Sequence, residues 1–138
     1  MRHERIGIGF IGGGFITRFH IQSLIGVRNC DVIGIMSRTT ASAEESAMLA
    51  RTIGVGQATV FDSITKMVED SRINAIWICA PNFTRIAVIE EICDAIESGK
   101  GELIGITCEK PLGRNVKEAK KVLELTQKAG LLDGYLEN

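Results

Sequence analysis

The sequence of 138 residues has few of the features that mark several large classes of protein. It has 16 Lys and Arg against 17 Asp and Glu, so it lacks the excess of positive charge that nucleic-acid and anionic-membrane binders carry. No unbroken apolar run of about 18 residues is present, so no segment is expected to span a bilayer. Its hydrophobic content of 45% is too high for a disordered chain. These absences predict a globular domain of ordinary size, with neither nucleic acid nor membrane as a partner.

Cysteine is also scarce, and its spacing contains no C-x-x-C pair. Metal sites need clustered ligands, so we expect small buried thiols, no bound metal and a reducing, cytoplasmic location. The first 16 residues superficially resemble a secretory signal, but glycine makes up five of the eleven residues 6–16. No small-residue cleavage site follows, so no signal peptide is expected. The four cysteines are Cys30, Cys79, Cys93 and Cys108.

Short apolar runs alternate with longer segments of helical spacing, which is the pattern of a parallel sheet with crossover helices. The near-continuous apolarity of the runs predicts strands buried on both faces. Right-handed crossovers then give an α/β, doubly wound, mostly parallel sheet, a Rossmann fold of six strands in the order 3-2-1-4-5-6. No linker or repeat interrupts the sequence, so residues 1–138 are expected to form a single domain. The expected strands are residues 6–11, 31–37, 59–61, 75–80, 103–108 and 132–135.

Five helices are expected between these strands, each with a start or stop signal. The first is expected to end before Gly26. The second is expected over residues 42–53, because Ser42 and Glu45 stand at capping-box spacing. The other three are expected to start after Ser63, to end at Gly99, and to run between Asn115 and Gly130.

A glycine-rich loop follows the first strand, and two registers of the G-x-G-x-x-G pattern overlap in it. Gly7-x-Gly9-x-x-Gly12 matches all three glycines, whereas Gly12-x-Gly14-x-x-Thr17 matches two. The motif works only as the turn from a strand end into a helix start, and only Gly12 follows the strand. The second register is therefore predicted.

In this register each loop residue has a defined role toward a dinucleotide. Gly12 makes the tight turn, and Gly14 leaves room for a pyrophosphate to approach the main chain. The amides of Phe15 and Ile16 and the positive end of the helix dipole receive its charge. Thr17 replaces the usual small third residue, so slightly looser packing of the helix on the strand is expected.

The end of the second strand predicts the choice of cofactor. An NAD-selective site usually has Asp or Glu there, to bind the ribose 2′-hydroxyl. This chain has Ser37-Arg38-Thr39, and a guanidinium between two hydroxyls suits a 2′-phosphate, so NADP is favoured over NAD. The alternative is that Ser37 and Thr39 only start the next helix and that Arg38 is a solvated charge.

Two further loops follow the fourth and fifth strands, at the sheet edge where doubly wound folds bind ligands. They read Ala80-Pro81-Asn82 and Glu109-Lys110-Pro111. Together with Gly12-x-Gly14 they make essentially the whole chain resemble the N-terminal domain of the Gfo/Idh/MocA family of NAD(P)-dependent oxidoreductases. The Glu-Lys-Pro triplet after a buried strand is the most specific part of this resemblance.

The resemblance implies roles for these residues. Ala80, Pro81 and Asn82 would line the nicotinamide side of the cleft, and Glu109 would approach the nicotinamide ribose. Lys110 would bind the substrate oxygen and help to relay its proton, which a partly desolvated ammonium of depressed pKa can do. The peptide bond after Lys110 is a candidate cis bond.

The resemblance also implies a function and shows where this chain departs from the family. The implied reaction moves hydride between NAD(P) and a sugar- or polyol-like substrate. The family's second domain, with its Asp and His for proton transfer, is absent, so the isolated chain is expected to bind cofactor weakly, to turn over little and to form a homo-oligomer. Many members carry a His a few residues after Pro-Asn, where this chain has Phe83-Thr84-Arg85. His20, on the first helix, is expected to be a packing or solvated residue.

Three other readings of the same residues stay open. The fold could serve a noncatalytic nucleotide-sensing module, to which Lys110 would matter little. Methyltransferases also bind nucleotides at a glycine loop, but the second strand here lacks their terminal acidic residue. Glucose-6-phosphate dehydrogenases share the Glu-Lys-Pro-x-Gly run, yet their Gly-x-x-Gly-Asp loop does not match the run from Gly12 to Phe15.

Overall fold

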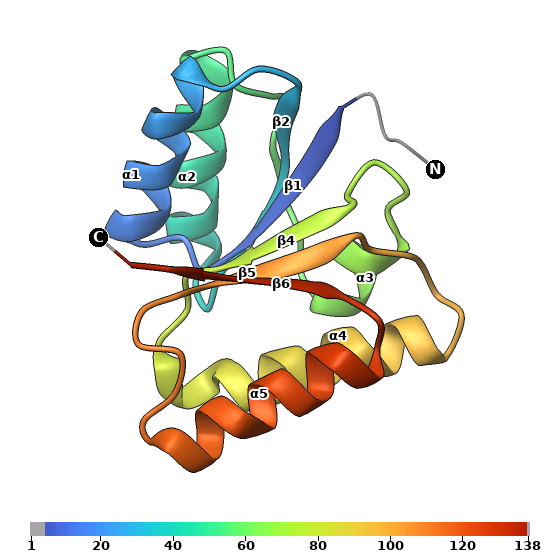
Figure 1. Cartoon of the computed structure of the whole chain (residues 1–138). Coiled ribbons are helices and arrows are strands. Elements are labelled where there is room, and N and C mark those ends of the chain that lie inside the picture. The colour runs from blue at the N-terminus through green and yellow to red at the C-terminus, as the bar shows by residue number, and fades with distance from the viewer. Residues whose placement is uncertain (1–4, 138) are drawn as a thin grey trace.

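The computed structural model describes residues 5–137, in which a parallel six-stranded sheet is flanked by helices on both faces (Figure 1). The strands follow the order β3-β2-β1-β4-β5-β6, as predicted. Short 3-10 helices occupy Leu24–Gly26 and Asn82–Thr84. The strands are β1 (Ile6–Ile11), β2 (Cys30–Met36), β3 (Thr59–Val60), β4 (Ala75–Ile78), β5 (Gly105–Glu109) and β6 (Leu132–Leu136). The α-helices are α1 (Phe15–Ser23), α2 (Thr40–Thr52), α3 (Ile64–Glu69), α4 (Arg85–Glu97) and α5 (Val116–Lys128).

The strand register aligns the carboxyl ends of the central strands. Ile11, the last residue of β1, pairs with Met36 of β2 and with Ile78 of β4. Ile78 pairs in turn with Cys108 of β5. All strands run in the same direction, so the loops that follow β1, β2, β4 and β5 leave the sheet side by side. The four loops expected to hold a ligand therefore share one edge of the sheet.

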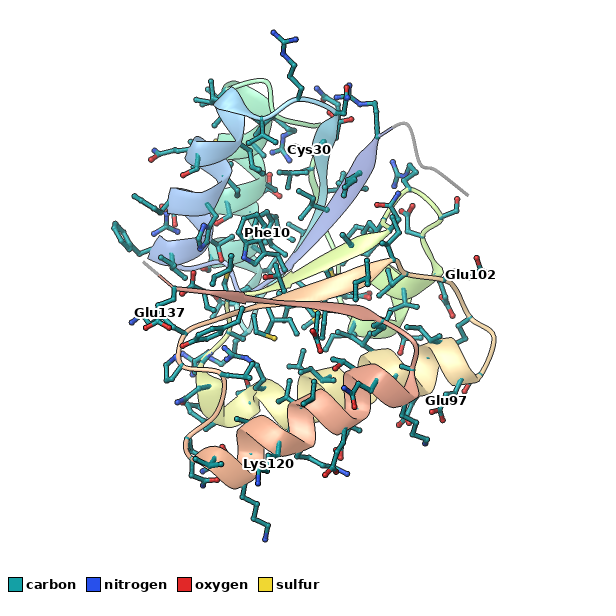
Figure 2. All side chains as sticks on the ribbon, viewed as in Figure 1. Phe10, Cys30, Glu97, Glu102, Lys120 and Glu137 are labelled. Carbon is teal, nitrogen blue, oxygen red and sulfur yellow. The ribbon has the colours of Figure 1, made fainter. Side chains whose placement is uncertain are left out.

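Each face of the sheet carries its own apolar core. Helices α1 and α2 cover one face, where Phe10 stacks on Trp77 with ring centroids 5.1 Å apart. Helices α3, α4 and α5 cover the other face, with Ile78 and Ile89 fully buried. Figure 2 shows Phe10 between the sheet and the α1–α2 layer, whereas Lys120 points from α5 into solvent. Within the described residues, no helix combines the length and the apolarity that a membrane span needs.

Several helix signals are confirmed. The side chains of Ser63 and Asn115 accept hydrogen bonds from the first-turn amides of α3 and α5. Gly99 and Gly130 follow α4 and α5 with φ of +71° and +68°, the left-handed conformation that ends many helices.

Two helix boundaries differ from the prediction. Helix α1 ends at Ser23, and Gly26 belongs to the following 3-10 helix. Helix α2 begins at Thr40 rather than at residue 42, because Thr39 is its N-cap and accepts from the amide of Ser42 at 3.4 Å. The capping-box spacing of Ser42 and Glu45 predicted the wrong start, because the hydroxyl of Ser42 donates to the carbonyl oxygen of Gly13 instead of capping the helix.

Burial of every strand on both faces was also a wrong prediction. Strand β6 is exposed at four of its five residues, with Leu132 at 70% and Tyr135 at 47% exposure. It lies at the edge of the sheet and pairs only with β5 within residues 5–137. The sequence of residues 132–135 therefore predicted a strand correctly, but it did not indicate how much of that strand other elements bury.

Candidate functional site

The glycine loop runs from the end of β1 into the start of α1, as the second register requires. Gly12 has φ of +107°, a backbone conformation that side chains rarely adopt. Its amide donates to the carbonyl of Met36 at 2.7 Å, which continues the ladder between β1 and β2. Gly7 and Gly9 lie inside β1. The turn therefore belongs to Gly12, and the two earlier glycines belong to the strand.

Gly14 is the N-cap of α1 and faces open space. A Cβ built on it would meet no heavy atom within 4 Å, and no side chain caps this helix end. Phe15 is 77% exposed and Ile16 is half-buried, so the first turn of α1 is accessible. A helix N-terminus with open amides and no acidic residue in its first turn fits the pyrophosphate of a dinucleotide.

Three donors hold the loop, two from α2 and one from α1. They converge on the carbonyl oxygen of Gly13: Ser42 Oγ at 2.7 Å, Ser46 Oγ at 3.0 Å and Arg18 Nη1 at 3.0 Å. Thr17 is fully buried, and its hydroxyl donates to the carbonyl of Gly12 at 2.7 Å. The slightly looser packing expected at Thr17 is therefore a wrong prediction, because its hydroxyl bonds the turn that the helix packs against.

The residues after β2 divide into two roles. Thr39 caps α2, as the structural alternative held, and is exposed. Ser37 and Arg38 line a hollow of about 560 Å³, which Asp62 and Lys66 also line. The ammonium of Lys66 pairs with Asp62 at 2.7 Å, whereas Arg38 is exposed. A hollow beside a free guanidinium has room for the ribose end of a dinucleotide.

The loop after β5 is bound tightly at Glu109 and open at Lys110. Glu109 is 5% exposed, and its Oε2 accepts from the amide of Lys110 at 3.2 Å. The bond between Lys110 and Pro111 is cis, as predicted. The Lys110 side chain is exposed, so the expected partial desolvation is not found in the described residues. Pro81 is exposed and Asn82 begins a 3-10 helix.

His20 is a packing residue, one of the two expected environments, but it also makes a contact that the sequence did not predict. It is 7% exposed, and its Nε2 lies 2.5 Å from Oε1 of Glu109. Its ring centroid is 4.6 Å from that of Trp77. Because Glu109 is buried with it, the pair connects the helix of the glycine loop to the Glu-Lys-Pro loop.

Arg85 is the other residue whose contacts at this edge of the sheet the sequence did not predict. It is 1% exposed, and its guanidinium reaches main-chain oxygens in both loops after β4 and β5. A local signal for His20 did exist, since Thr17, His20 and Ile21 mark one buried face of α1 by their spacing. No local signal distinguishes Arg85 from a solvated arginine at a helix start.

The cysteines beside the site are the partly buried Cys79 and the buried Cys108. Burial raises the pKa of Cys79 to about 12 and that of Cys108 to about 11. Cys79 directly precedes Ala80 and so lies at the edge of the sheet that holds the site. Because the pKa of its thiol is far above 7, no thiolate nucleophile is expected at this edge at neutral pH. Within residues 5–137, no three His, Cys, Asp or Glu side chains gather as a metal site would need.

Alkylation should separate these thiols in the folded chain. At pH 8, iodoacetamide is expected to modify the half-exposed Cys30 before Cys79 and Cys108, because only the thiolate reacts and burial disfavours it. Mass spectrometry of tryptic peptides measures the order, and the same reaction in urea should modify all three. Equal rates for Cys30 and Cys79 in the folded chain would contradict the burial seen here.

Comparison with known proteins supports the same fold. A family model, the Gfo/Idh/MocA oxidoreductase family with an NAD-binding Rossmann fold, matches residues 6–134. The 1,5-anhydro-D-fructose reductase of Ensifer adhaerens is 29% identical over 126 residues, which are 91% of this chain and 34% of the reductase. The chain therefore spans about a third of the length of this relative.

Two solved structures have the same fold at low identity. The myo-inositol dehydrogenase of Lactobacillus casei, in complex with NAD(H) and myo-inositol, has a TM-score of 0.72 at 22% identity, covering 90% of this chain and 34% of its own. KijD10, a 3-ketoreductase from Actinomadura kijaniata in complex with NADP, has a TM-score of 0.76 at 19% identity, covering 95% and 37%. Since the family model covers nearly the whole chain, this protein belongs to the Gfo/Idh/MocA oxidoreductase family, and its described residues form the NAD-binding Rossmann fold of that family.

Proposed function

We propose that this chain is the dinucleotide-binding part of an oxidoreductase that moves hydride between NAD(P) and a sugar- or polyol-like substrate. The observation that carries the proposal is the open N-terminus of α1 behind Gly14, on the same sheet edge as the Glu-Lys-Pro loop. The names of two relatives, an anhydrofructose reductase and an inositol dehydrogenase, support the substrate class.

Each site residue has a proposed part in binding. Gly14 and the amides of Phe15 and Ile16 hold the pyrophosphate, while Gly12 shapes the turn beneath it. Ala80, Pro81 and Asn82 line the nicotinamide side. When bound, the nicotinamide supplies the hydride chemistry, and the protein supplies position and electrostatics.

Glu109 and Lys110 have different proposed tasks. Glu109 is buried against His20, so it acts as a fixed acceptor at the nicotinamide ribose. The exposed Lys110 ammonium binds the substrate oxygen and holds the proton that the reaction transfers at that atom.

The first test is a calorimetric titration of the chain with NAD(H) and NADP(H). Saturable binding of either cofactor is expected, with weak affinity. We favour NADP, because Ser37 and the free guanidinium of Arg38 line the hollow after β2. Absence of binding by every form of both cofactors would reject the proposed function.

The cofactor preference has its own variant. Arg38→Ala should weaken NADP binding about tenfold to a hundredfold, the loss expected for charge-assisted hydrogen bonds, while NAD binding stays within about twofold. Arg28→Ala, an exposed arginine outside the site, is the control. Equal losses for NADP and NAD would mean that Arg38 stacks on the adenine rather than reading the 2′-phosphate.

The location and the assembly of the chain are also proposals. The four cysteines are free, which supports a reducing, cytoplasmic compartment. The exposed side chains of Val116, Leu123 and Tyr135 border an apolar hollow of about 530 Å³ between α5 and β6. Contiguous apolar surface of this kind supports self-association into a homo-oligomer.

A further inference from the structure

We infer that Arg85 is a positioning residue, which fastens the Glu-Lys-Pro loop to the loop after β4 and so builds the nicotinamide end of the site. The inference rests on the proposed function, because it assigns Arg85 to the same cofactor site. It adds a residue that neither the glycine loop nor the Glu-Lys-Pro motif contains.

The geometry of Arg85 is that of a clamp between two loops. Its Nη1 donates to the carbonyl oxygens of Glu109 at 2.7 Å, Pro111 at 2.7 Å and Leu112 at 3.2 Å. Its Nη2 donates to the carbonyl oxygen of Ala80 at 3.0 Å. One side chain, the first of α4, therefore holds the loop after β4 and both sides of the cis bond after β5.

The guanidinium of Arg85 is buried because it donates hydrogen bonds to main-chain carbonyl oxygens of the two loops. Arg85 is 1% exposed, and burying a cation without an ion pair is unfavourable. Its hydrogen bonds in the described residues all go to main-chain carbonyls, and its Nε has no partner there. An apolar side chain would fill the same space at lower cost. The four inward-facing carbonyl oxygens, however, need hydrogen-bond donors, and the planar guanidinium of arginine supplies several at once.

Glu109 is consequently held from two directions. Arg85 binds its carbonyl oxygen from the α4 side of the sheet, and His20 binds its carboxylate from the α1 side. Loss of Arg85 leaves the His20 contact in place but frees the main chain that carries Lys110. The expected result is a mobile nicotinamide end beside an unchanged pyrophosphate end.

Hydrogen–deuterium exchange of the free chain tests the clamp without any ligand. In Arg85→Met, the two loops lose the hydrogen bonds from the guanidinium to their carbonyl oxygens and should open more often. The backbone amides of residues 79–84 and 109–114 should then exchange at least about tenfold faster, while peptides from β1 and α2 stay unchanged. Arg85→Lys, which keeps the charge but not the fork, should give an intermediate rate. Arg51→Met removes a similar helix-to-main-chain bond, to Ala58, and should leave both loops protected.

Binding of NADH and of ADP tests the positional claim. ADP lacks both the nicotinamide and the ribose that carries it, so its affinity should stay within about twofold in Arg85→Met, while NADH affinity falls at least about tenfold. A merely structural role would weaken both ligands equally. If circular dichroism shows that Arg85→Met does not fold, the same comparison is made with Arg85→Lys.

The outcomes separate the inference from the function on which it rests. Wild-type chain that binds no form of NAD or NADP rejects the proposed function, and unchanged exchange in both loops then rejects the clamp as well. Wild-type binding with identical exchange and identical NADH affinity in the Arg85 variants rejects the clamp alone. Faster exchange confined to the two loops, with NADH binding weakened and ADP binding unaffected, supports the clamp.

Discussion

A Gly14→Val chain should fold as the wild type does and lose about a hundredfold in dinucleotide affinity. The φ of Gly14 is −83°, which valine adopts, and its Cβ would meet no protein atom within 4 Å. The side chain would fill the space that a pyrophosphate needs, and each charge-assisted bond lost costs about 1.5 to 3 kcal/mol. Thermal unfolding should show a loss of at most about 1 kcal/mol, the difference between valine and glycine at an N-cap.

The measurement is a titration with NAD(H) and NADP(H), alongside Gly26→Val. Gly26 also faces open space and has no positive φ, but it lies in the 3-10 helix after α1, away from the candidate site. Its valine variant should bind as the wild type does. Unchanged binding by Gly14→Val would show that the pyrophosphate does not approach this turn.

Gly7→Ala should have the opposite effect, a large loss of stability. A Cβ on Gly7 would overlap the main-chain oxygen of Arg72, so β1 would have to separate from the turn before β4. Overpacking against backbone has little room to relax, and we expect a loss of about 3 kcal/mol in the free energy of unfolding. For a domain of this size that lowers Tm by roughly 10 °C.

Thermal and urea unfolding measure this effect, with Gly26→Ala as the control. The residual folded fraction of Gly7→Ala should keep its cofactor affinity, because Gly7 lies in β1 and not in the loop. The two variants thus distinguish the overlapping registers: Gly14→Val loses binding and Gly7→Ala loses stability. A binding defect in Gly7→Ala at full stability would favour the first register.

The fold was predictable because its signals are local. Each strand is a short apolar run, and start and stop signals of the helices lie at their own ends in the sequence. In α5 these signals are Asn115 at the start and Gly130 after the end. The register of the glycine loop followed from one physical condition, that the turn must stand between a strand and a helix. The strand order then followed from right-handed crossovers alone.

The buried contacts of the site could not be predicted in the same way. His20 and Glu109 are 89 residues apart, and Arg85 reaches carbonyls up to 27 residues away. The spacing on α1 indicates that His20 faces the core, but it does not identify Glu109 as its partner. Arginine side chains are usually solvated, so local sequence favours the wrong environment for Arg85. Ser42 was assigned to a helix cap for the same reason, because its bond to the glycine loop spans 29 residues. Only the tertiary fold distinguishes a donor in the core from one in water.

The place of β1 in the middle of the sheet has a consequence for synthesis on the ribosome. Gly7 on β1 bonds to Asn74, which leads into β4 and lies 67 residues later in the chain. At about 5 to 20 residues per second, β4 emerges roughly 3 to 13 s after β1. During that interval β1 can pair with β2, but its other edge stays open and apolar. The open edge of β1 in such a nascent chain can pair with a strand of another chain, which leads to aggregation. We therefore expect folding of this domain to benefit from a chaperone that binds the nascent chain before β4 has been synthesised.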